Sequence, residues 1–229
     1  ILILPDGRLI VAGYVIPTGN LPAQILLLRL TTAGALDPTF GTGGVTTVDV
    51  GPLSDLALAV ARQTDGRLVV CGQTRKTSTT SDACVLRFDG EGHLDPTFSG
   101  GGIFVRGGGT RSEAFNGLAL QPDGRLLLAG GSTNDGATIS DQLVMRLNPD
   151  GAPDPSFGDG GSLVMDSGSP GDAAADIVAL ADGRIVVAGT HAYLMSASLL
   201  EGDAASAVGD GGDGSSLPRV GLPRPNPTE

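Results

Sequence analysis

The sequence has no tryptophan, only two histidines and two cysteines, and little positive charge. Its 229 residues carry 14 Lys and Arg against 25 Asp and Glu, a formal net charge of −11. This balance leaves no basic stripe to neutralise nucleic-acid phosphates, which argues against a nucleic-acid partner. No apolar run approaches the roughly 20 residues that a membrane-spanning helix requires. We therefore expect no nucleic-acid binding and no membrane span.

Catalytic motifs are also scarce. His93 and His191 are the only candidate histidine bases, and the sequence has no Gly-x-Ser-x-Gly elbow beside which either could act. We expect both to be solvated turn residues. A Gly-x-Gly-x-x-Gly pattern at 209–214 lacks the flanking strand and helix that give a dinucleotide site its mechanism. The sequence therefore predicts no catalytic residues.

The two cysteines, Cys71 and Cys84, fall in one repeat on strands expected to be neighbours in a hairpin. One interpretation is two small buried side chains, because Ala occupies the position of Cys71 in the other three repeats. The alternative is a cross-strand disulfide, which would add at most about 3 kcal/mol by closing so short a loop. There is no Cys-x-x-Cys spacing, so a metal or redox role is not expected.

What the sequence does contain is a repeat. Asp-Gly-Arg triplets start at residues 6, 65, 123 and 182, and Asp-Pro-(Thr/Ser)-Phe elements start at residues 37, 95 and 154. The steps of 58 to 59 residues between them show that one supersecondary unit has been copied. The fold is therefore predicted for one unit and then applied to each copy.

The second copy illustrates the unit. Its apolar or β-branched runs at 45–50, 57–62, 67–72 and 83–88 are separated by glycine-rich or polar turns, and Asp65-Gly66 between two such runs is a strong hairpin signal. Four short antiparallel strands with no helical period are the content of one propeller blade. We predict an all-β, β-propeller-like array of four-stranded antiparallel blades, about 58 to 59 residues per repeat.

The predicted organisation is a partial first repeat (1–40), a second (41–98), a third (99–157) and a degenerate fourth (158–208). Residues 209–229 form a closing strand or a disordered Gly/Pro-rich tail. Alignment of the glycine motifs places Ala197 where Arg146 stands in the third copy. The chain starts within a repeat, so we expect a piece of a larger propeller. A closed four-bladed ring, with 215–220 supplying the first blade's missing strand, is the less favoured alternative.

Three polar or aromatic positions recur once per repeat. Each arginine precedes the aspartate of the Asp-Pro element by eight residues, and a phenylalanine ends that element: Arg29, Asp37 and Phe40; Arg87, Asp95 and Phe98; Arg146, Asp154 and Phe157. The arginines could form a ring of anion-binding guanidinium groups. We favour Arg–Asp pairing that fixes how one blade leads to the next, because Arg and carboxylate groups suit bidentate contacts. The phenylalanines are predicted to be interblade plugs.

Metal and partner sites are weakly indicated. Asp210 with Asp213, or Asp150 with Asp154, could bind calcium, but no Asp-x-Asp-x-Asp ladder supplies the six to eight oxygens required. We expect no cofactor, and calcium is the one alternative. The loops at 14–24, 73–82 and 132–141 vary between copies, so they are the predicted sites for a protein or carbohydrate ligand.

The full unit, Asp-Gly-Arg-(apolar)3-Ala-Gly followed by Arg-Leu-x-x-x-Gly-x-x-Asp-Pro-(Thr/Ser)-Phe-Gly, resembles the delta-60 repeat. That resemblance implies β-propeller blades in large bacterial proteins, often secreted or envelope-associated, with no assigned activity and no catalytic residues. We therefore expect a non-enzymatic scaffold or binding module located outside the cell or in its envelope. The alternatives are a fragment of a propeller enzyme, a hydrolase or lyase with its active site in missing blades, and a calcium-stabilised surface adhesion module.

Overall fold

The computed structural model describes residues 1–19, 21–107, 110–133, 140–166, 171–191 and 194–200. In these residues the chain forms short strands and no helix, so the all-β prediction is confirmed. None of the described residues belongs to a helix that could cross a membrane.

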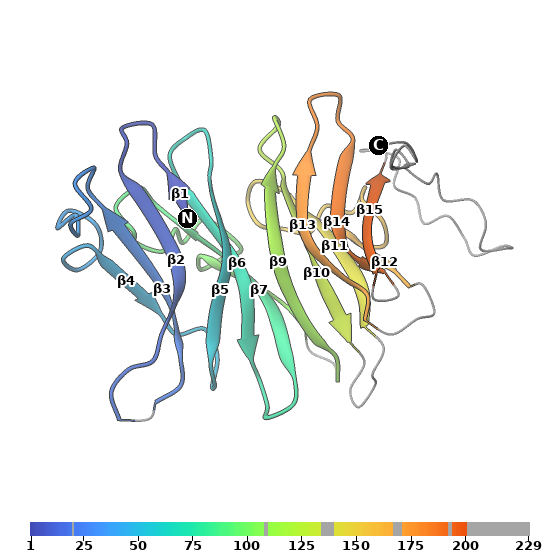
Figure 1. Ribbon diagram of the computed structural model, residues 1–229, viewed down its shortest axis with the longest axis horizontal. Coiled ribbons are helices and arrows are strands. Elements are labelled where there is room, and N and C mark those ends of the chain that lie inside the picture. Colours follow the sequence, from blue (N-terminus) through green and yellow to red (C-terminus); the bar gives the residue numbers. More distant parts are fainter. Residues whose placement is uncertain (20, 108–109, 134–139, 167–170, 192–193, 201–229) are drawn as a thin grey trace, which may run out of the picture.

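The strands form four antiparallel sheets in chain order, which we call blades 1 to 4 (Figure 1). Blade 1 contains β1 (Leu2–Ile3), β2 (Leu9–Val15), β3 (Gln24–Leu30) and β4 (Val45–Val48). Blade 2 contains β5 (Asp55–Arg62), β6 (Leu68–Arg75), β7 (Ser81–Phe88) and β8 (Ile103–Arg106). Blade 3 contains β9 (Ser112–Leu120), β10 (Leu126–Thr133), β11 (Ser140–Leu147) and β12 (Ser162–Met165). The described part of blade 4 contains β13 (Ala173–Ala179), β14 (Ile185–His191) and β15 (Leu194–Leu200).

The strand that follows each glycine pair belongs to the preceding blade, which corrects the predicted grouping. β4 was expected to open the second repeat, but it pairs with β3, with Val45 opposite Leu28. Gly44, at φ +96°, reverses the chain, and its carbonyl accepts a hydrogen bond from the Arg29 N–H at 3.0 Å. Blade 1 therefore already has four strands and needs none from 215–220, a segment that lies outside the described residues.

The Asp-Gly-Arg hairpins form as predicted. Gly66 adopts φ +96°, and Asp65 Oδ1 accepts a hydrogen bond from the Arg67 N–H at 3.0 Å. The same bond recurs from Arg8, Arg125 and Arg184 to the aspartate two residues earlier. These four turns gather along one edge of the molecule, which we call the turn rim (top of Figure 1).

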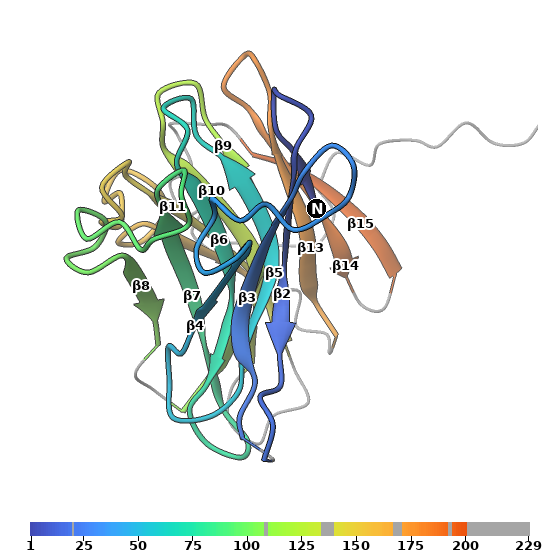
Figure 2. The ribbon, with the colours of Figure 1, turned by 90° about the vertical axis from the view of Figure 1, so that its left-hand side faces the viewer.

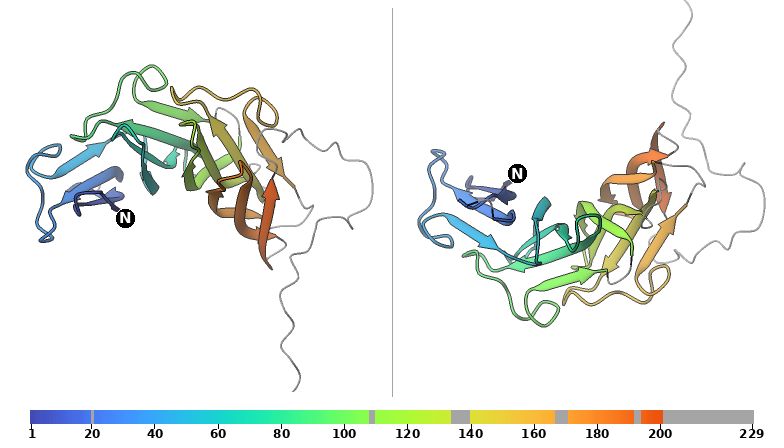
Figure 3. Two further views of the ribbon diagram at one scale, coloured as in Figure 1. Left: turned by 90° about the horizontal axis from the view of Figure 1, so that it is seen from above. Right: turned by 90° about the horizontal axis from the view of Figure 1, so that it is seen from below.

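The blades pack face to face, and each junction encloses one hydrophobic cluster. The first cluster joins blades 1 and 2, the second joins blades 2 and 3, and the third joins blades 3 and 4. The central strands β6 and β7 are covered on both faces, so their side chains are buried almost without interruption. Figure 3 shows the stacked sheets following an open arc, with blades 1 and 4 at its two ends, and Figure 2 shows the same stack from the side of blade 1.

The connections opposite the turn rim are shorter than predicted because the strands run further. β6 continues to Arg75 and β7 begins at Ser81, so part of the predicted 73–82 loop is sheet. We call this edge, where β2, β6 and β10 end and β3, β7 and β11 begin, the loop rim (bottom of Figure 1). Residues 134–139 lie outside the described residues, so only the two ends of the predicted 132–141 loop can be compared with the structure.

Cys71 and Cys84 are free and buried, so the disulfide alternative is wrong. They do lie on adjacent strands, as expected, but Cys84 pairs with Gly72 and Cys71 with Val85. Neighbours offset by one residue point to opposite faces of a sheet, and the two thiols accordingly enter different clusters. Burial raises the pKa of the Cys71 thiol to about 12, which leaves it protonated at neutral pH.

Candidate functional site

The recurrent arginine, aspartate and phenylalanine meet at each blade junction. At the first junction, Arg29 Nε lies 2.8 Å from Asp37 Oδ2. Its Nη1 donates to the Gly90 carbonyl of blade 2 at 2.6 Å, so this side chain connects two blades directly. The guanidinium also covers the Phe40 ring, 4.9 Å from its centre, as a cation–π contact. We call this arrangement the clamp.

The Arg–Asp pair and the contact with the phenylalanine ring recur at the other two junctions. Arg87 Nε pairs with Asp95 at 2.8 Å and its Nη1 donates to the Pro149 carbonyl of the next blade, while Arg146 Nε pairs with Asp154 at 2.7 Å. The distances from the two guanidinium carbons to the centres of the phenylalanine rings below them are 4.8 and 4.9 Å. The predicted Arg–Asp pairing is confirmed, and a free ring of anion-binding guanidinium groups is not formed by these arginines.

The phenylalanines are interblade plugs, as predicted. Phe40, Phe98 and Phe157 are each fully buried, and each enters the cluster shared with the following blade. Phe40 belongs to blade 1 but packs in one cluster with Leu68 and Leu86 of blade 2. Each plug therefore buries an aromatic ring in the neighbouring blade.

Each clamp contains a second arginine that the repeat pattern did not predict. Arg8, Arg67 and Arg125 come from the Asp-Gly-Arg turns and reach the same aspartates at 2.7, 2.8 and 3.3 Å. The sequence contains a signal for this second pairing, because the Asp-Gly-Arg triplet and the Asp-Pro element recur together in the first three repeats at nearly constant spacing. The pairing could not be predicted because it depends on how the turn folds over the end of the third strand.

The clamp holds its carboxylates ionised. Hydrogen bonds from the Thr39 hydroxyl and from Arg8 hold the pKa of Asp37 well below its usual range. For Asp95, burial acts to raise the pKa, but hydrogen bonds from Thr97 and the charges on the two arginines outweigh it, so its pKa is also lowered. Asp154 follows the same pattern, with Ser156 in the place of Thr97.

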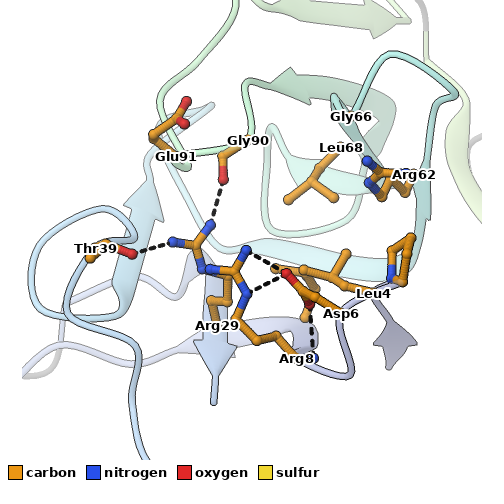
Figure 4. A pocket seen from close by; sticks show the side chains of 12 residues that line it. Leu4, Asp6, Arg8, Arg29, Thr39, Arg62, Gly66, Leu68, Gly90 and Glu91 are labelled. Carbon is orange, nitrogen blue, oxygen red and sulfur yellow. Dashed lines mark hydrogen bonds and ion pairs between the residues drawn. The ribbon is translucent and has the colours of Figure 1, made fainter. Parts of the chain in front are cut away.

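A cavity of about 430 Å³ opens at the first junction on the turn rim (Figure 4). Arg8 and Arg29 form one side, with Asp6 and Thr39 bound to them, and Arg62 and Leu68 of blade 2 lie opposite. Among the described residues Arg62 has no ion-pair partner, whereas Arg8 contacts two carboxylates. The lining residues include no histidine, cysteine or serine, and the Thr39 hydroxyl donates to the Asp37 carboxylate at 2.7 Å.

The loop rim presents exposed apolar side chains at the end of β2 and on the connection that follows it. Tyr14, Ile16 and Leu21 of blade 1 are 54, 63 and 55% exposed. The corresponding connection of blade 2 is polar, and its side chains form local interactions. Lys76 Nζ lies 2.7 Å from Asp82, and the Thr77 hydroxyl accepts a hydrogen bond from the Thr80 N–H. The predicted 14–24 loop is therefore the most apolar described part of this rim, a property that the count of aromatics in the sequence did not reveal.

Buried polar residues line the loop-rim end of the central sheets. In blade 2, Asp55 pairs across the strands with Thr74, and Thr74 with Asp82. Among the described residues, no group meets hydrogen-bond geometry with Asp55 Oδ1, Thr74 Oγ1 or Asp82 Oδ1, although all three atoms are buried and Asp55 and Thr74 are close neighbours. Burial raises the pKa of Asp55, although the nearby Thr74 hydroxyl and the Val50 and Gly51 amides act to lower it.

The remaining predicted site residues are separate from one another. His93 is largely exposed and lies 3.2 Å from Asp89, so it is a turn residue as expected; the side chain of His191 is outside the description. The Asp154 carboxylate faces Arg146, whereas Asp150 accepts the Ala152 N–H, and Asp210 and Asp213 lie outside the described residues. No cluster of three or more metal-ligating acidic, histidine or cysteine side chains occurs in the part of the chain that is described.

Blade 4 departs from the pattern at a different residue from the one predicted. Arg29, Arg87 and Arg146 stand opposite Ile10, Val69 and Leu127, respectively. The equivalent strand position in blade 4, Val186, stands opposite Leu199 and not Ala197. Leu199 therefore replaces the clamp arginine, and the glycine-based alignment was wrong by two residues.

Successive four-stranded antiparallel blades, each locked to the next by an aromatic plug, define a β-propeller repeat protein. Comparison with family models agrees: residues 4–40, 63–98 and 121–157 match a family described as "Domain of unknown function (DUF5122) beta-propeller". The matched stretches contain the Asp-Gly-Arg and Asp-Pro elements of the first three repeats.

No curated protein matches the chain at a significant level. Among solved structures, the mannose phosphorylase MPT-4 from Leishmania mexicana, in complex with phosphate ion, is similar with a TM-score of 0.44 and 15% identity. The match covers 84% of this chain and 63% of that one, so the chain spans less than two thirds of the length of the phosphorylase.

Proposed function

We propose that this protein is a non-enzymatic binding module that contacts a protein or carbohydrate ligand through its loop rim. The observation that carries this proposal is the exposure of Tyr14 at the end of β2 and of Ile16 and Leu21 on the connection that follows it. Large apolar side chains gathered on one exposed connection are typical of interaction sites, and propellers commonly place variable binding loops on a constant scaffold.

The clamp supports the same function by elimination. The recurrent charged residues that could have formed an anion site are occupied in pairs at the junctions. The repeated ionisable groups therefore serve the scaffold, and the features that differ between blades lie in the connections. We further propose that the repeats are of the delta-60 type and that the module acts at a bacterial cell surface or outside it, on the strength of the recurrent sequence unit.

A direct test uses arrays of immobilised glycans and peptides probed with the purified protein. A ligand found in this way should lose affinity for a Tyr14→Ser, Ile16→Ser, Leu21→Ser variant. Leu58→Ser is the matched control, because Leu58 is 47% exposed but lies on β5, away from this connection. Binding that is unchanged in the loop variant, or chemical conversion of the bound compound, would contradict the proposal.

A further inference from the structure

Blade 1 leaves uncovered the face that blades 2 and 3 each cover with the preceding blade. On this face the central positions are only partly buried in blade 1, whereas the equivalent positions of blade 2 are 2% exposed or less. These positions are Leu9, Val11, Leu28 and Leu30 in blade 1 and Leu68, Val70, Leu86 and Phe88 in blade 2. The uncovered surface is thus one half of an interface that the molecule forms internally.

A glycine marks where the plug of a preceding blade enters. An ideal Cβ on Gly92 would lie 2.7 Å from the Phe40 ring, and one on Gly151 would lie 2.7 Å from the Phe98 ring. Gly34 occupies the equivalent place in blade 1 with the same left-handed backbone, and no atom of a described residue lies within 4 Å of its ideal Cβ. Blade 1 therefore contains an equivalent site for a phenylalanine ring, which we call the seat, and no described residue fills it.

The polar half of this seat is present as well. Gly90 and Pro149, whose carbonyls accept the clamp arginines of the preceding blades, correspond to Thr32 in blade 1. Leu94, which packs into the first cluster, corresponds to Leu36, which is 46% exposed. An arginine donor and an apolar plug would together complete these contacts.

We propose that this face of blade 1 is a docking surface for a further blade that carries the Arg and Asp-Pro-(Thr/Ser)-Phe elements of the clamp. The occupant is specified by its chemistry, because the surface offers a carbonyl acceptor, a glycine seat for a ring and an apolar sheet. A second copy of this chain fits less well. The exposed face of its blade 4 presents Leu199, which cannot donate to the Thr32 carbonyl, in place of the clamp arginine.

The test adds such a blade to the full chain. A copy of residues 2–59 is placed before Ile1. Residues 55–59 of the copy and residues 1–3 of the original chain then form one continuous strand, equivalent to β5, whose residues 60–62 correspond to residues 1–3. The added copy then presents its own Arg29 and Phe40 to the uncovered face. Urea unfolding of this extended chain should be one cooperative transition with a higher midpoint than that of the original chain.

Gly34→Ala in the original blade 1 shows whether the added blade packs on the uncovered face or is only covalently linked to it. In the original chain the substitution should cost only the strain of its positive φ, as should the control Gly43→Ala, which also has no atom within 4 Å of its ideal Cβ. In the extended chain Gly34→Ala should lower the midpoint further, because its methyl group would meet the plug ring. Gly43→Ala should have the same effect in both chains.

A second extended chain, with Arg29→Met and Phe40→Ala confined to the added copy, tests the chemistry of the plug. We expect it to lose the gain in midpoint. An added blade that melts separately, or a Gly34→Ala effect that is equal in both chains, would overturn the proposal. Concentration-dependent dimerisation of the original chain that Ile3→Lys abolishes would also overturn it, because a second copy would then cover this face.

Discussion

At the residue scale, the clamp arginines are held from several sides at once. Arg87 contacts Asp95, the Thr97 hydroxyl, the Pro149 carbonyl and the face of Phe98. A guanidinium group is suited to this position because its planar set of donors can satisfy separate acceptors while its face stacks on a ring. Lysine could not reproduce these contacts, which explains why the position recurs as arginine in the first three blades.

Arg87→Met should destabilise the protein strongly. Removing one partner of a buried ion pair typically costs about 3–5 kcal/mol, because the remaining charge is left uncompensated. Arg67 still contacts Asp95, so we expect a loss near the lower end of that range. Urea unfolding measures the effect.

The matched control is Arg62→Met, since Arg62 is exposed and has no ion-pair partner among the described residues. It should change the free energy of unfolding by no more than about 0.5 kcal/mol. Equal losses in the two variants would contradict the structural role of the clamp.

The clamp also predicts how stability depends on pH. The pKa values of Asp37, Asp95 and Asp154 are lowered on folding, so the unfolded chain binds more protons in the acid range. Their contribution is fully present above the unfolded pKa, near 4, and is lost as the pH falls through the folded values. The free energy of unfolding should therefore decrease below about pH 4.

Asp95→Asn isolates this effect. The difference in unfolding free energy between wild type and variant should be large at pH 7 and shrink as the pH falls. The control Asp159→Asn replaces an exposed aspartate and should give only a small difference at pH 7. A difference for Asp95→Asn that persists unchanged at pH 3 would show that its charge is not responsible.

At the scale of the strand, the sequence predicted what depends on local pattern. The Asp-Gly hairpins, the four strands per unit and the interblade phenylalanines all follow from turn chemistry, alternation and spacing, and the structure confirms them. The pairing partner of β4 was predicted wrongly, because a strand beside a glycine pair can fold back or continue forward with the same sequence. The second clamp arginine and the exposed 14–24 loop depend on tertiary contacts that a repeat pattern does not encode.

The polar end of blade 2 gives an element-scale prediction. Asp55→Asn should raise the free energy of unfolding at pH 7 by about 1 kcal/mol, since an unsatisfied buried polar atom costs about 1–3 kcal/mol. The amide could donate to the unpartnered Thr74 Oγ1 and still accept the Val50 N–H, which now lies 2.7 Å from Asp55 Oδ2.

The sign of the pH dependence tests the cause. Burial raises the pKa of Asp55, so its destabilising effect is present above the folded pKa and disappears once the pH is below the unfolded one. The gain in Asp55→Asn should therefore vanish at pH 3. Thr74→Val, which removes the neighbouring hydroxyl, should reduce the gain at pH 7, and a loss of stability in Asp55→Asn would contradict this account.

At the scale of the molecule, each hydrophobic cluster of the described residues joins one blade to the next. Each of the three clusters combines residues from two successive blades, and the ends of the arc remain apart (Figure 3). Stability in such an array is approximately the sum of intrinsic blade terms and nearest-neighbour interface terms. The clamps therefore determine whether the array unfolds as one unit.

Native-state hydrogen exchange measured by mass spectrometry tests this coupling most directly. Phe98 joins blades 2 and 3, and Phe→Ala substitutions in cores cost about 3–5 kcal/mol. In Phe98→Ala, protection should fall together in β6 and β10, whereas Leu58→Ala should leave both unchanged. Loss of protection in β6 alone, with β10 at its wild-type level, would show that the blades are independent and that the clamp is not what unites them.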